Sequence, residues 1–324
     1  MRKPKILVVG SMVMDQIFTT PRFPDPGETV LGSEYRTAAG GKGANQAVQA
    51  ARLGADVTLV GKVGDDAFGH ELLQSANASS VDVSHVTVDP NATTAVCDIQ
   101  IQVGDGQRMN RIIVVPGANH QIAPAEIAFL EESISDYDMV MLQLEISMEI
   151  NQMVAAYAHA KGVPVMLNCA PIAPLPEELL KHVTYLSPNE HEAKILTGIE
   201  VKDDASIIQA LGCIRAMGVE RALITLGDRG VAYENEDGVL MYSKALSGLD
   251  VKDTTAAGDS FVGAFCTAVC SGVEMKRALE FANHTAALTV CRMGAQPSLP
   301  TIREVLTLME SRKCETAPFQ SLIY

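Results

Sequence analysis

Short apolar runs alternate with amphipathic, helix-like stretches along most of the chain. The runs KILVVG, DVTLVGKVG, DMVMLQLE, VPVMLN and RALITLG are rich in Val, Ile and Leu without polar alternation, as is typical of strands buried on both faces. Helical patterns such as GANQAVQAARLG and EINQMVAAYAHAKG lie between them. This order predicts a mainly parallel central sheet with helices on both sides, which is a three-layer α/β/α fold.

Two segments depart from this pattern. Residues 16–38 contain three prolines and the alternating run TVLGSEYRTA, and residues 94–115 read as two strands around a Gly-Asp-Gly turn. Both are typical of antiparallel strands outside the main sheet, and such strands predict a small β-lid over a cleft. We therefore expect a body at 1–15, 39–93 and 116–310, a lid at 16–38 and 94–115, and a loosely held tail at 311–324.

Composition excludes several classes of function. The 324 residues include 25 basic and 39 acidic side chains, a formal net charge of −14, so we expect no nucleic-acid partner. No apolar run approaches the ~18 residues of a membrane span, and MRKPKILVVG reads as a first strand rather than an export signal. The seven cysteines form no C-x-x-C pair, so we expect reduced thiols in a cytoplasmic protein without a membrane partner.

The segment DTTAAGDSF at 253–261 carries the clearest chemistry, because it leads into the apolar helix FVGAFCTAVC. A helix start leaves backbone N–H groups unpaired and adds the positive end of the helix dipole, so it binds anions such as phosphate. Ala256, Ala257 and Gly258 permit close backbone approach, and Asp259 adds a carboxylate. A general base beside a phosphate site indicates phosphoryl transfer. The alternative is that Asp259 only stabilises the helix start.

The segment GGKGAN at 40–45 opens the first long helix. It is not a Walker loop, because Gly43 follows Lys42 where that loop has Ser or Thr. The first strand also lacks the G-x-G-x-x-G fingerprint, since Gly10 is followed by SMVMD, and this weakens the alternative of a nicotinamide oxidoreductase. The plain structural interpretation is a glycine turn with a solvated lysine.

Together these segments resemble the ribokinase-type (PfkB) sugar kinases. The similar motifs run in order from about residue 6 to residue 300 and comprise GSMVMD, PGETVLG, GGKGANQAVQAARLGA, VGDDAFG, LQLE, SPNEHEAKILTG, ITLGDRG, DTTAAGDSFVGAF and GAQPSLP. The resemblance implies the Rossmann-like fold of that family with its β-lid. GGKGAN and LQLE resemble the ribokinase branch, which implies ATP-dependent phosphorylation of D-ribose at O5 and a homodimer through the lids.

The resemblance also implies roles for individual residues. Asp259 matches the catalytic base, and the backbone amides from Ala256 to Asp259, those of Ala257 and Gly258 included, match the anion hole. The matches to sugar-binding positions are Asp15, Gly40, Gly41, Lys42, Asn45, Glu145 and Asp259. The matches to ATP-contacting positions are Asn189, Glu192, Thr225, Gly227, Gly258 and Asn283. Glu192 is further expected to order Mg²⁺ through water. The matches to a monovalent cation loop, which implies activation by K⁺, are Asp253, Thr255, Thr289, Arg292, Gly294 and Ser298.

One residue departs from the family pattern. Bacterial members of the ribokinase branch usually carry Asn where this chain has Val13, and that Asn would hydrogen-bond the sugar. An unpaired hydroxyl costs roughly 1–3 kcal/mol, and deoxyribokinase relatives also place an apolar residue here. A kinase for 2-deoxyribose, or for another pentose or a nucleoside, is therefore an alternative. A non-catalytic sugar or nucleotide sensor is the alternative from another class.

Overall fold

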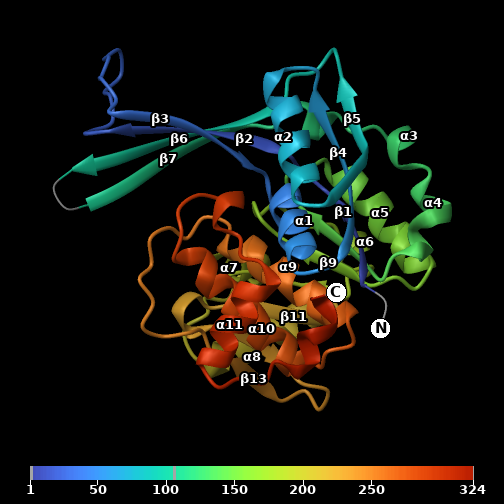
Figure 1. The fold of residues 1–324 in the computed structure, drawn as a ribbon. Coiled ribbons are helices and arrows are strands. Elements are labelled where there is room, and N and C mark those ends of the chain that lie inside the picture. Colours follow the sequence, from blue (N-terminus) through green and yellow to red (C-terminus); the bar gives the residue numbers. More distant parts are fainter. Residues whose placement is uncertain (1–2, 105–106, 324) are drawn as a thin grey trace.

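A nine-stranded sheet forms the centre of the body in the computed structural model, which describes residues 3–104 and 107–323 (Figure 1). Its strands in spatial order are β13 (Leu240–Ser243), β12 (Val231–Glu234), β11 (Arg221–Thr225), β10 (Tyr185–Leu186), β9 (Val165–Asn168), β8 (Met139–Gln143), β1 (Lys5–Val9), β4 (Asp56–Gly64) and β5 (Val81–Asp89). All pairs from β11 to β5 are parallel, whereas β12 and β13 are antiparallel to their neighbours. This confirms the predicted, mainly parallel sheet.

Two apolar cores cover the two faces of the sheet. In β1, Ile6 and Val8 belong to one core and Leu7 belongs to the other, as the alternation of side chains along a strand requires. The helices of the first core are α1 (Lys42–Arg52), α2 (Ala67–Ala78), α9 (Ala257–Cys270), α10 (Met275–Val290) and α11 (Ile302–Ser311). Those of the second are α3 (Pro124–Ile127), α4 (Leu130–Ser133), α5 (Met148–Ala160), α6 (Glu177–Leu180), α7 (Glu190–Thr197) and α8 (Asp204–Ala216). Within the described residues, helices of bilayer-spanning length and apolarity are absent.

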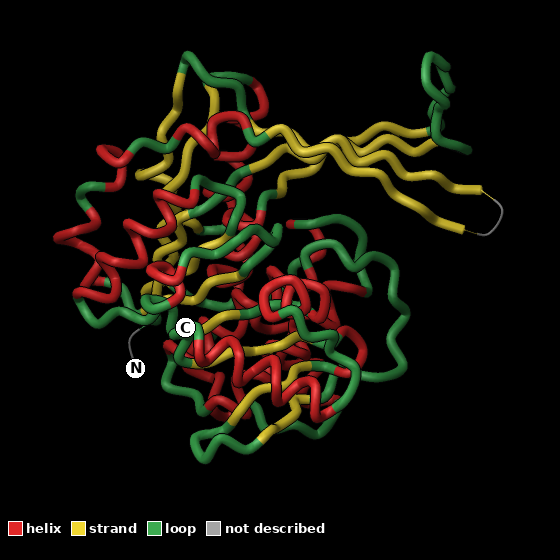
Figure 2. The backbone as a smooth tube through the Cα atoms, turned by 180° about the vertical axis from the view of Figure 1, so that it is seen from behind, coloured by secondary structure: helices red, strands yellow, loops and turns green. Residues whose placement is uncertain are grey.

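A separate four-stranded sheet forms the lid, which leaves the body as one extended ribbon (Figure 2). Its spatial order is β3 (Glu34–Gly40), β2 (Val13–Thr20), β6 (Ala95–Gly104) and β7 (Gln107–Val115). The β2–β3 and β6–β7 pairs are antiparallel as expected, but β2 and β6 pair in parallel, because the chain returns to the body between them. The turn expected near 105 lies outside the described residues. The first pair of lid strands starts at Val13 and ends at Gly40, so the lid sheet extends beyond the expected bounds of 16–38 at both ends.

The C-terminal stretch packs against the body, which corrects the expectation of a loosely held tail. A short 3-10 helix spans Ala317–Leu322 after α11. Phe319 is fully buried, and its ring stacks on Phe281 of α10 with centroids 4.4 Å apart. Leu322 is buried in the same core. Two apolar anchors on a segment without helical periodicity are enough to hold it, because each buries a large side chain.

Candidate active site

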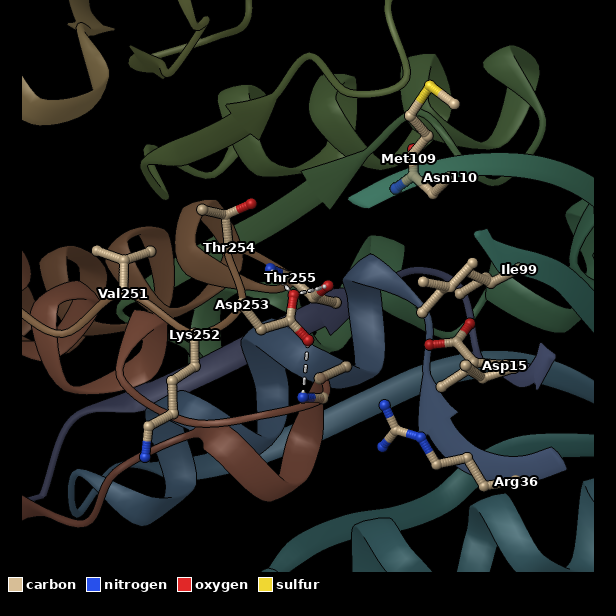
Figure 3. Close-up of a pocket in the computed structure, with 14 residues that line it drawn as sticks. Asp15, Arg36, Ile99, Met109, Asn110, Val251, Lys252, Asp253, Thr254 and Thr255 are labelled. Atoms are coloured by element: carbon tan, nitrogen blue, oxygen red, sulfur yellow. Dashed lines mark hydrogen bonds between the residues drawn. The ribbon is translucent and has the colours of Figure 1, made fainter. Parts of the chain in front are cut away.

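Two neighbouring cavities lie beyond the carboxyl ends of the parallel strands, where the lid meets the body. The first has a volume of about 520 Å³, and Asp15 and Arg36 of the lid line it opposite Asp253 and Thr255 of the loop before α9 (Figure 3). The second has a volume of about 390 Å³ and is lined by the start of α9 and the ends of β9 and β11. Thr254 borders both. We call them the lid cavity and the helix cavity; open α/β sheets bind ligands at such places.

The wall of the helix cavity contains the start of α9. Its N-cap residue, Ala256, has φ 60° and ψ 10°, a left-handed conformation that costs a non-glycine residue about 1–2 kcal/mol. Ala256, Ala257 and Gly258 all line the cavity. The backbone N–H groups of Gly258 and Asp259 find no acceptor among the described residues. The structure therefore places unpaired donors and the positive end of a helix dipole at this wall, which suits an anion.

Asp259 lies in the first turn of α9 with only 6% of its surface exposed. Its Oδ2 accepts a hydrogen bond from Asn45 Nδ2 at 3.0 Å, and its Oδ1 accepts one from Gln46 Nε2 at 3.1 Å. Each carboxylate oxygen keeps a further lone pair, so the group can still accept a proton. Asn45 Oδ1 is buried without a partner among the described residues, which leaves it for a ligand.

Glu145 follows β8 and caps the start of α1. Its Oε2 accepts hydrogen bonds from Ser11 Oγ at 2.5 Å and from Lys42 N at 2.8 Å. Gly43 N donates in turn to Ser11 Oγ at 3.2 Å. A carboxylate at a helix N-terminus satisfies N–H groups that have no partner within the helix. Capping uses only Oε2 of Glu145, and Oε1 makes no hydrogen bond with the described residues.

Asp15 projects from β2 and is also buried, with 9% of its surface exposed. Burial, followed by the negative charges of Glu145 and Asp259, raises its pKa to about 7. A Cβ at Gly40 would lie 2.6 Å from Asp15 Oδ2, so this glycine leaves room for the carboxylate. The structure thus brings three carboxylates into one region, and carboxylates can accept several hydroxyl protons.

The side chain of Lys42 lines the helix cavity rather than the lid cavity. Burial by itself lowers the pKa of its amine, but the charges of Asp259, Glu145 and Glu192 outweigh burial and leave the pKa raised. Lys42 is therefore a cation close to the unpaired amides of α9. Its backbone N–H, bound to Glu145, is the part of this residue that lies with the predicted sugar-binding carboxylates.

Asn189 and Glu192 form a capping box at the start of α7. Glu192 N donates to Asn189 Oδ1, and Asn189 N donates to Glu192 Oε2, both at 2.8 Å. Cys169 Sγ lies 3.8 Å from the same Glu192 oxygen. Helix capping accounts for part of the Asn-x-x-Glu pattern. Both residues also line the helix cavity, so their free atoms remain available there.

The structure gathers all the predicted ATP-contacting residues around the helix cavity. These residues are Asn189, Glu192, Thr225, Gly227, Gly258 and Asn283. Asn283 Nδ2 donates to Ser243 O at 3.0 Å, to Ser243 Oγ at 2.9 Å and to Lys244 O at 3.2 Å. These bonds tie α10 to the segment after β13, so Asn283 supports one wall of the cavity as well as lining it.

The predicted cation loop is held by Asp253. Its Oδ1 accepts hydrogen bonds from Thr255 N at 3.0 Å and from Thr255 Oγ1 at 2.6 Å, and its Oδ2 accepts one from Gly294 N at 3.0 Å. Gly294 has φ 87°, the left-handed region that favours glycine. The carboxylate therefore joins the loop before α9 to the turn after α10.

The remaining members of this predicted loop also use their side chains internally. Thr289 Oγ1 donates to Thr285 O at 3.1 Å, and Ser298 Oγ donates to Ala295 O at 2.7 Å. Arg292 turns toward Glu304 instead, at 2.5 Å. The side chains of Thr289, Arg292 and Ser298 are therefore all engaged within the protein. In the described parts of the chain, His, Cys, Asp and Glu side chains form no group of three that could hold a metal ion.

Sequence reasoning did not single out four polar residues of the site: Ser11, Arg36, Gln46 and Gln143. Arg36 lines the lid cavity and forms no ion pair with another described residue. Gln46 and Gln143 are fully buried. Gln143 could have been found from the sequence, because it ends the apolar strand MVMLQ and a buried amide needs hydrogen-bond partners.

A buried carboxylate at a helix N-terminus, with further carboxylates on one side and a cavity on the other, is the arrangement of an α/β phosphotransferase. The sequence pattern of the pfkB family of carbohydrate kinases matches residues 3–302, and the chain belongs to this family. A ribokinase of Bacillus subtilis is 42% identical over 94% of this chain and 99% of its own length. A ribokinase of Schizosaccharomyces pombe is 39% identical over 93% and 96%. The structure of Arabidopsis thaliana ribokinase complexed with ribose and ATP superposes with a TM-score of 0.88 at 34% identity, covering 95% of this chain and 99% of that one.

Gly41, the N-cap residue of α1, provides a test of how the site is built. It has φ 89°, and a Cβ there would lie 2.7 Å from Val13 N and 2.9 Å from Ser11 O. We expect Gly41→Ala to lower the free energy of unfolding by about 2 kcal/mol or more, because backbone strain adds to steric overlap. Gly212→Ala, in open space on α8, should raise it by about 0.5–1 kcal/mol. Denaturant titrations measure both; similar changes in the two variants would contradict this account of Gly41.

Proposed function

We propose that this protein is an ATP-dependent ribokinase that phosphorylates D-ribose at O5. The observation that carries the proposal is the buried carboxylate of Asp259 beside the unpaired N–H groups that open α9. The similarity to ribokinases along nearly the whole chain supports the choice of substrates, and one of those proteins holds ribose and ATP in its structure.

Asp259 acts as the general base. It takes the proton from the O5 hydroxyl while O5 forms a bond to the γ-phosphorus of ATP, and the bond from that phosphorus to the bridging oxygen of ADP breaks. The products are ribose 5-phosphate and ADP. The N–H groups of Gly258 and Asp259 and the amine of Lys42 stabilise charge on the transferring group. Burial strengthens these interactions, because the local dielectric is low.

Carboxylate and amide oxygens hold the ribose hydroxyls. Asp15 comes from the lid, whereas Asn45 and Glu145 come from the body, so one sugar contacts both parts. Each offers an acceptor that no described residue uses: Asn45 Oδ1 is buried and unpaired, and Glu145 Oε1 makes no hydrogen bond. Hydroxyl donors on the ligand would satisfy these groups, which are costly to leave unpaired.

Two cations complete the proposed reaction. The residues of the helix cavity fit Mg²⁺, because Glu192 is buried there and capping uses only one of its oxygens. Mg²⁺ keeps several waters and needs one or two carboxylates besides phosphate oxygens. Bound with ATP, it supplies charge neutralisation. K⁺ is proposed to bind backbone carbonyl oxygens of the loop around Asp253, because the side chains of Thr289, Arg292 and Ser298 are engaged within the protein. This loop leads directly into the start of α9.

We place the protein in the cytoplasm. All seven cysteines are free thiols, and Cys97, Cys169 and Cys266 are buried. Free thiols are typical of proteins in reducing compartments.

Replacing Asp259 tests the base. We expect Asp259→Asn to lower kcat by about 100- to 10,000-fold, because the amide cannot take the O5 proton. KM for ribose and ATP should change little, because Asn has almost the same size and shape as Asp, and Asp15, Asn45 and Glu145 still hold the sugar. ADP release measures turnover, and Asp237→Asn on the exposed β12–β13 turn is the matched control. Turnover that survives Asp259→Asn contradicts the assignment, and ribose binding without ADP release by the unaltered protein indicates a sensor.

Val13 favours 2-deoxyribose as a second candidate substrate. It lies two residues before Asp15 on β2, so the two side chains share a face of the lid. Val13 is buried with Ala95 and Cys97 in a small apolar cluster. The wall next to Asp15 therefore offers no hydrogen bond to a sugar hydroxyl, and a sugar that lacks one hydroxyl would lose nothing there.

The substitution Val13→Asn distinguishes the two sugars. We expect it to raise the ratio of kcat/KM for ribose over 2-deoxyribose by about 10-fold, because a restored hydrogen bond contributes about 1–2 kcal/mol. Val13→Leu keeps the wall apolar and serves as the control. The unaltered protein is measured with ribose, 2-deoxyribose, fructose, nucleosides and no sugar. A ratio that does not rise in the Asn variant removes Val13 from sugar selection.

The lid also has the features of a dimer interface. Its outer strands, β3 and β7, each have a strand neighbour on one side only among the described residues. On β7, Ile112 is 53% exposed and Ile113 is 60% exposed. Unpaired edges and exposed apolar side chains favour association. We propose that two lids pair in a homodimer.

Light scattering after size exclusion tests this pairing. We expect a mass near twice 34.5 kDa for the unaltered chain. Ile112→Lys should shift the mass toward the monomer, because a charge is costly in an apolar interface. Ile208→Lys, at a site 49% exposed on α8, should leave the dimer intact. A monomer at working concentration, or equal effects of the two variants, contradicts pairing through the lid.

A further inference from the structure

Two fully buried glutamines form a chain that ends on the carboxylate of Asp259. We propose that Gln46 holds this carboxylate in its reactive orientation and that Gln143 fixes the amide of Gln46. Both are positioning residues, since they act through the base rather than on the sugar or the nucleotide. The inference rests on the proposed role of Asp259 as the general base.

The chain of hydrogen bonds is continuous from the sheet to the base. Gln143, at the end of β8, donates from Nε2 to Gln46 Oε1 at 2.7 Å. Gln46, on α1, donates from Nε2 to Asp259 Oδ1 at 3.1 Å. Both glutamines are 0% exposed and Asp259 is 6% exposed. Water therefore has no ready access to replace either bond.

Donor and acceptor chemistry allows only one orientation for each amide in this series of hydrogen bonds. A carboxylate can only accept hydrogen bonds, so Gln46 must present its NH₂ group to Asp259. Its carbonyl oxygen then faces Gln143, which must present its own NH₂ group in turn. Gln46 cannot reverse its amide without placing an oxygen against a carboxylate. Each amide thus fixes the orientation of the next.

The far end of the chain is held by backbone. Gln143 O accepts a hydrogen bond from Asn151 Nδ2 of α5 at 2.8 Å, and strand pairing fixes the backbone of Gln143 in the sheet. Gln143 Oε1 has no partner among the described residues. A Cβ at Gly10 would overlap this oxygen, so the glycine leaves the room for the amide. An unpaired buried oxygen is costly, which is consistent with a functional demand on this orientation.

Without the hydrogen bond from Gln46, neighbouring charges would rotate the carboxylate of Asp259. Asp259 interacts with Lys42 of α1 and with Asp15 of β2, and Glu145 after β8 and Glu192 of α7 act on the same lysine. Asp15 repels Asp259 when it is ionised, whereas Lys42 attracts it. Asn45 pins only Oδ2. Because Gln46 donates to Oδ1 as well, each carboxylate oxygen has one hydrogen bond, and the carboxylate cannot rotate. Its free lone pairs therefore always point the same way. A general base must lie within hydrogen-bonding distance of the proton it takes, so this direction matters for turnover.

The experiment removes each hydrogen bond with an unbranched apolar side chain. We expect Gln46→Met to lower kcat by about 10- to 100-fold, as the loss of one hydrogen bond to a charged group predicts. KM for ribose and for ATP should change by less than about threefold, since the glutamine touches neither substrate. Gln143→Met should lower kcat by about 3- to 10-fold, because Gln46 keeps its bond but loses its support.

Gln49→Met is the matched control. Gln49 lies one turn later on α1, is also 0% exposed, and donates to Pro300 O at 2.9 Å instead of to the base. Its loss should lower thermal stability about as much as the loss of Gln46 but leave kcat unchanged. A fall in kcat of similar size in both variants would mean that α1 packing alone is responsible, and this would overturn the proposal.

Combined variants separate the relay from the proposed function. Gln46→Met with Gln143→Met should lower kcat no more than Gln46→Met alone, because Gln143 acts only through Gln46. In an Asp259→Asn background, Gln46→Met should cause no further loss. Additive losses in either combination would overturn the relay. Normal kcat in Gln46→Met, with collapse in Asp259→Asn, would overturn the relay and leave the base assignment intact.

Turnover that survives Asp259→Asn overturns the proposed base, and the relay falls with it. If Gln46→Met does not fold, Gln143→Met decides. A lower kcat with unchanged KM and a folded protein by circular dichroism supports the relay, and an unchanged kcat overturns it.

Discussion

The hydrogen bonds between α1 and the Asp259 carboxylate join the two halves of the site. Asn45 and Gln46 of α1 reach an acid that lies more than 200 positions later in the chain. The same helix begins at the glycine turn over β2 and is capped by Glu145. One helix therefore sets the distance between Glu145 and Asp259, and so between the proposed sugar site and the proposed phosphate site at the start of α9. In the proposed reaction, sugar binding and proton transfer both depend on that spacing.

Electrostatics in this site are balanced by a small number of fixed groups. Asp15, Glu145 and Asp259 are three carboxyl groups in one region, and burial, followed by the charges of Glu145 and Asp259, raises the pKa of Asp15 to about 7. Helix N-termini and Lys42 provide the opposing positive field. An arrangement that holds unpaired acceptors on one side and unpaired donors on the other is complementary to a polyhydroxyl ligand and a polyphosphate.

The lid takes part in both the proposed sugar site and the proposed dimer interface. β2 carries Asp15 into the lid cavity, and its sheet extends to exposed apolar side chains on β7. Contacts that order the lid in a dimer would also position the wall of the pocket, because strand pairing makes these residues parts of one sheet. The proposed sugar selectivity and the proposed dimer therefore involve the same sheet.

Hydrophobic periodicity is a local property, and for that reason the parallel sheet and the lid segments could be predicted from the sequence. Family membership followed instead from the resemblance of motifs that run in order along the chain. Tertiary structure alone decided the packing of Phe319, the parallel pairing of β2 with β6, and the placement of the Lys42 side chain beside the helix cavity. It also decided the contact of Gln143 with Gln46, 97 positions apart. Such contacts depend on how finished elements pack, and a local pattern of residues carries no record of a partner that the chain meets only after folding.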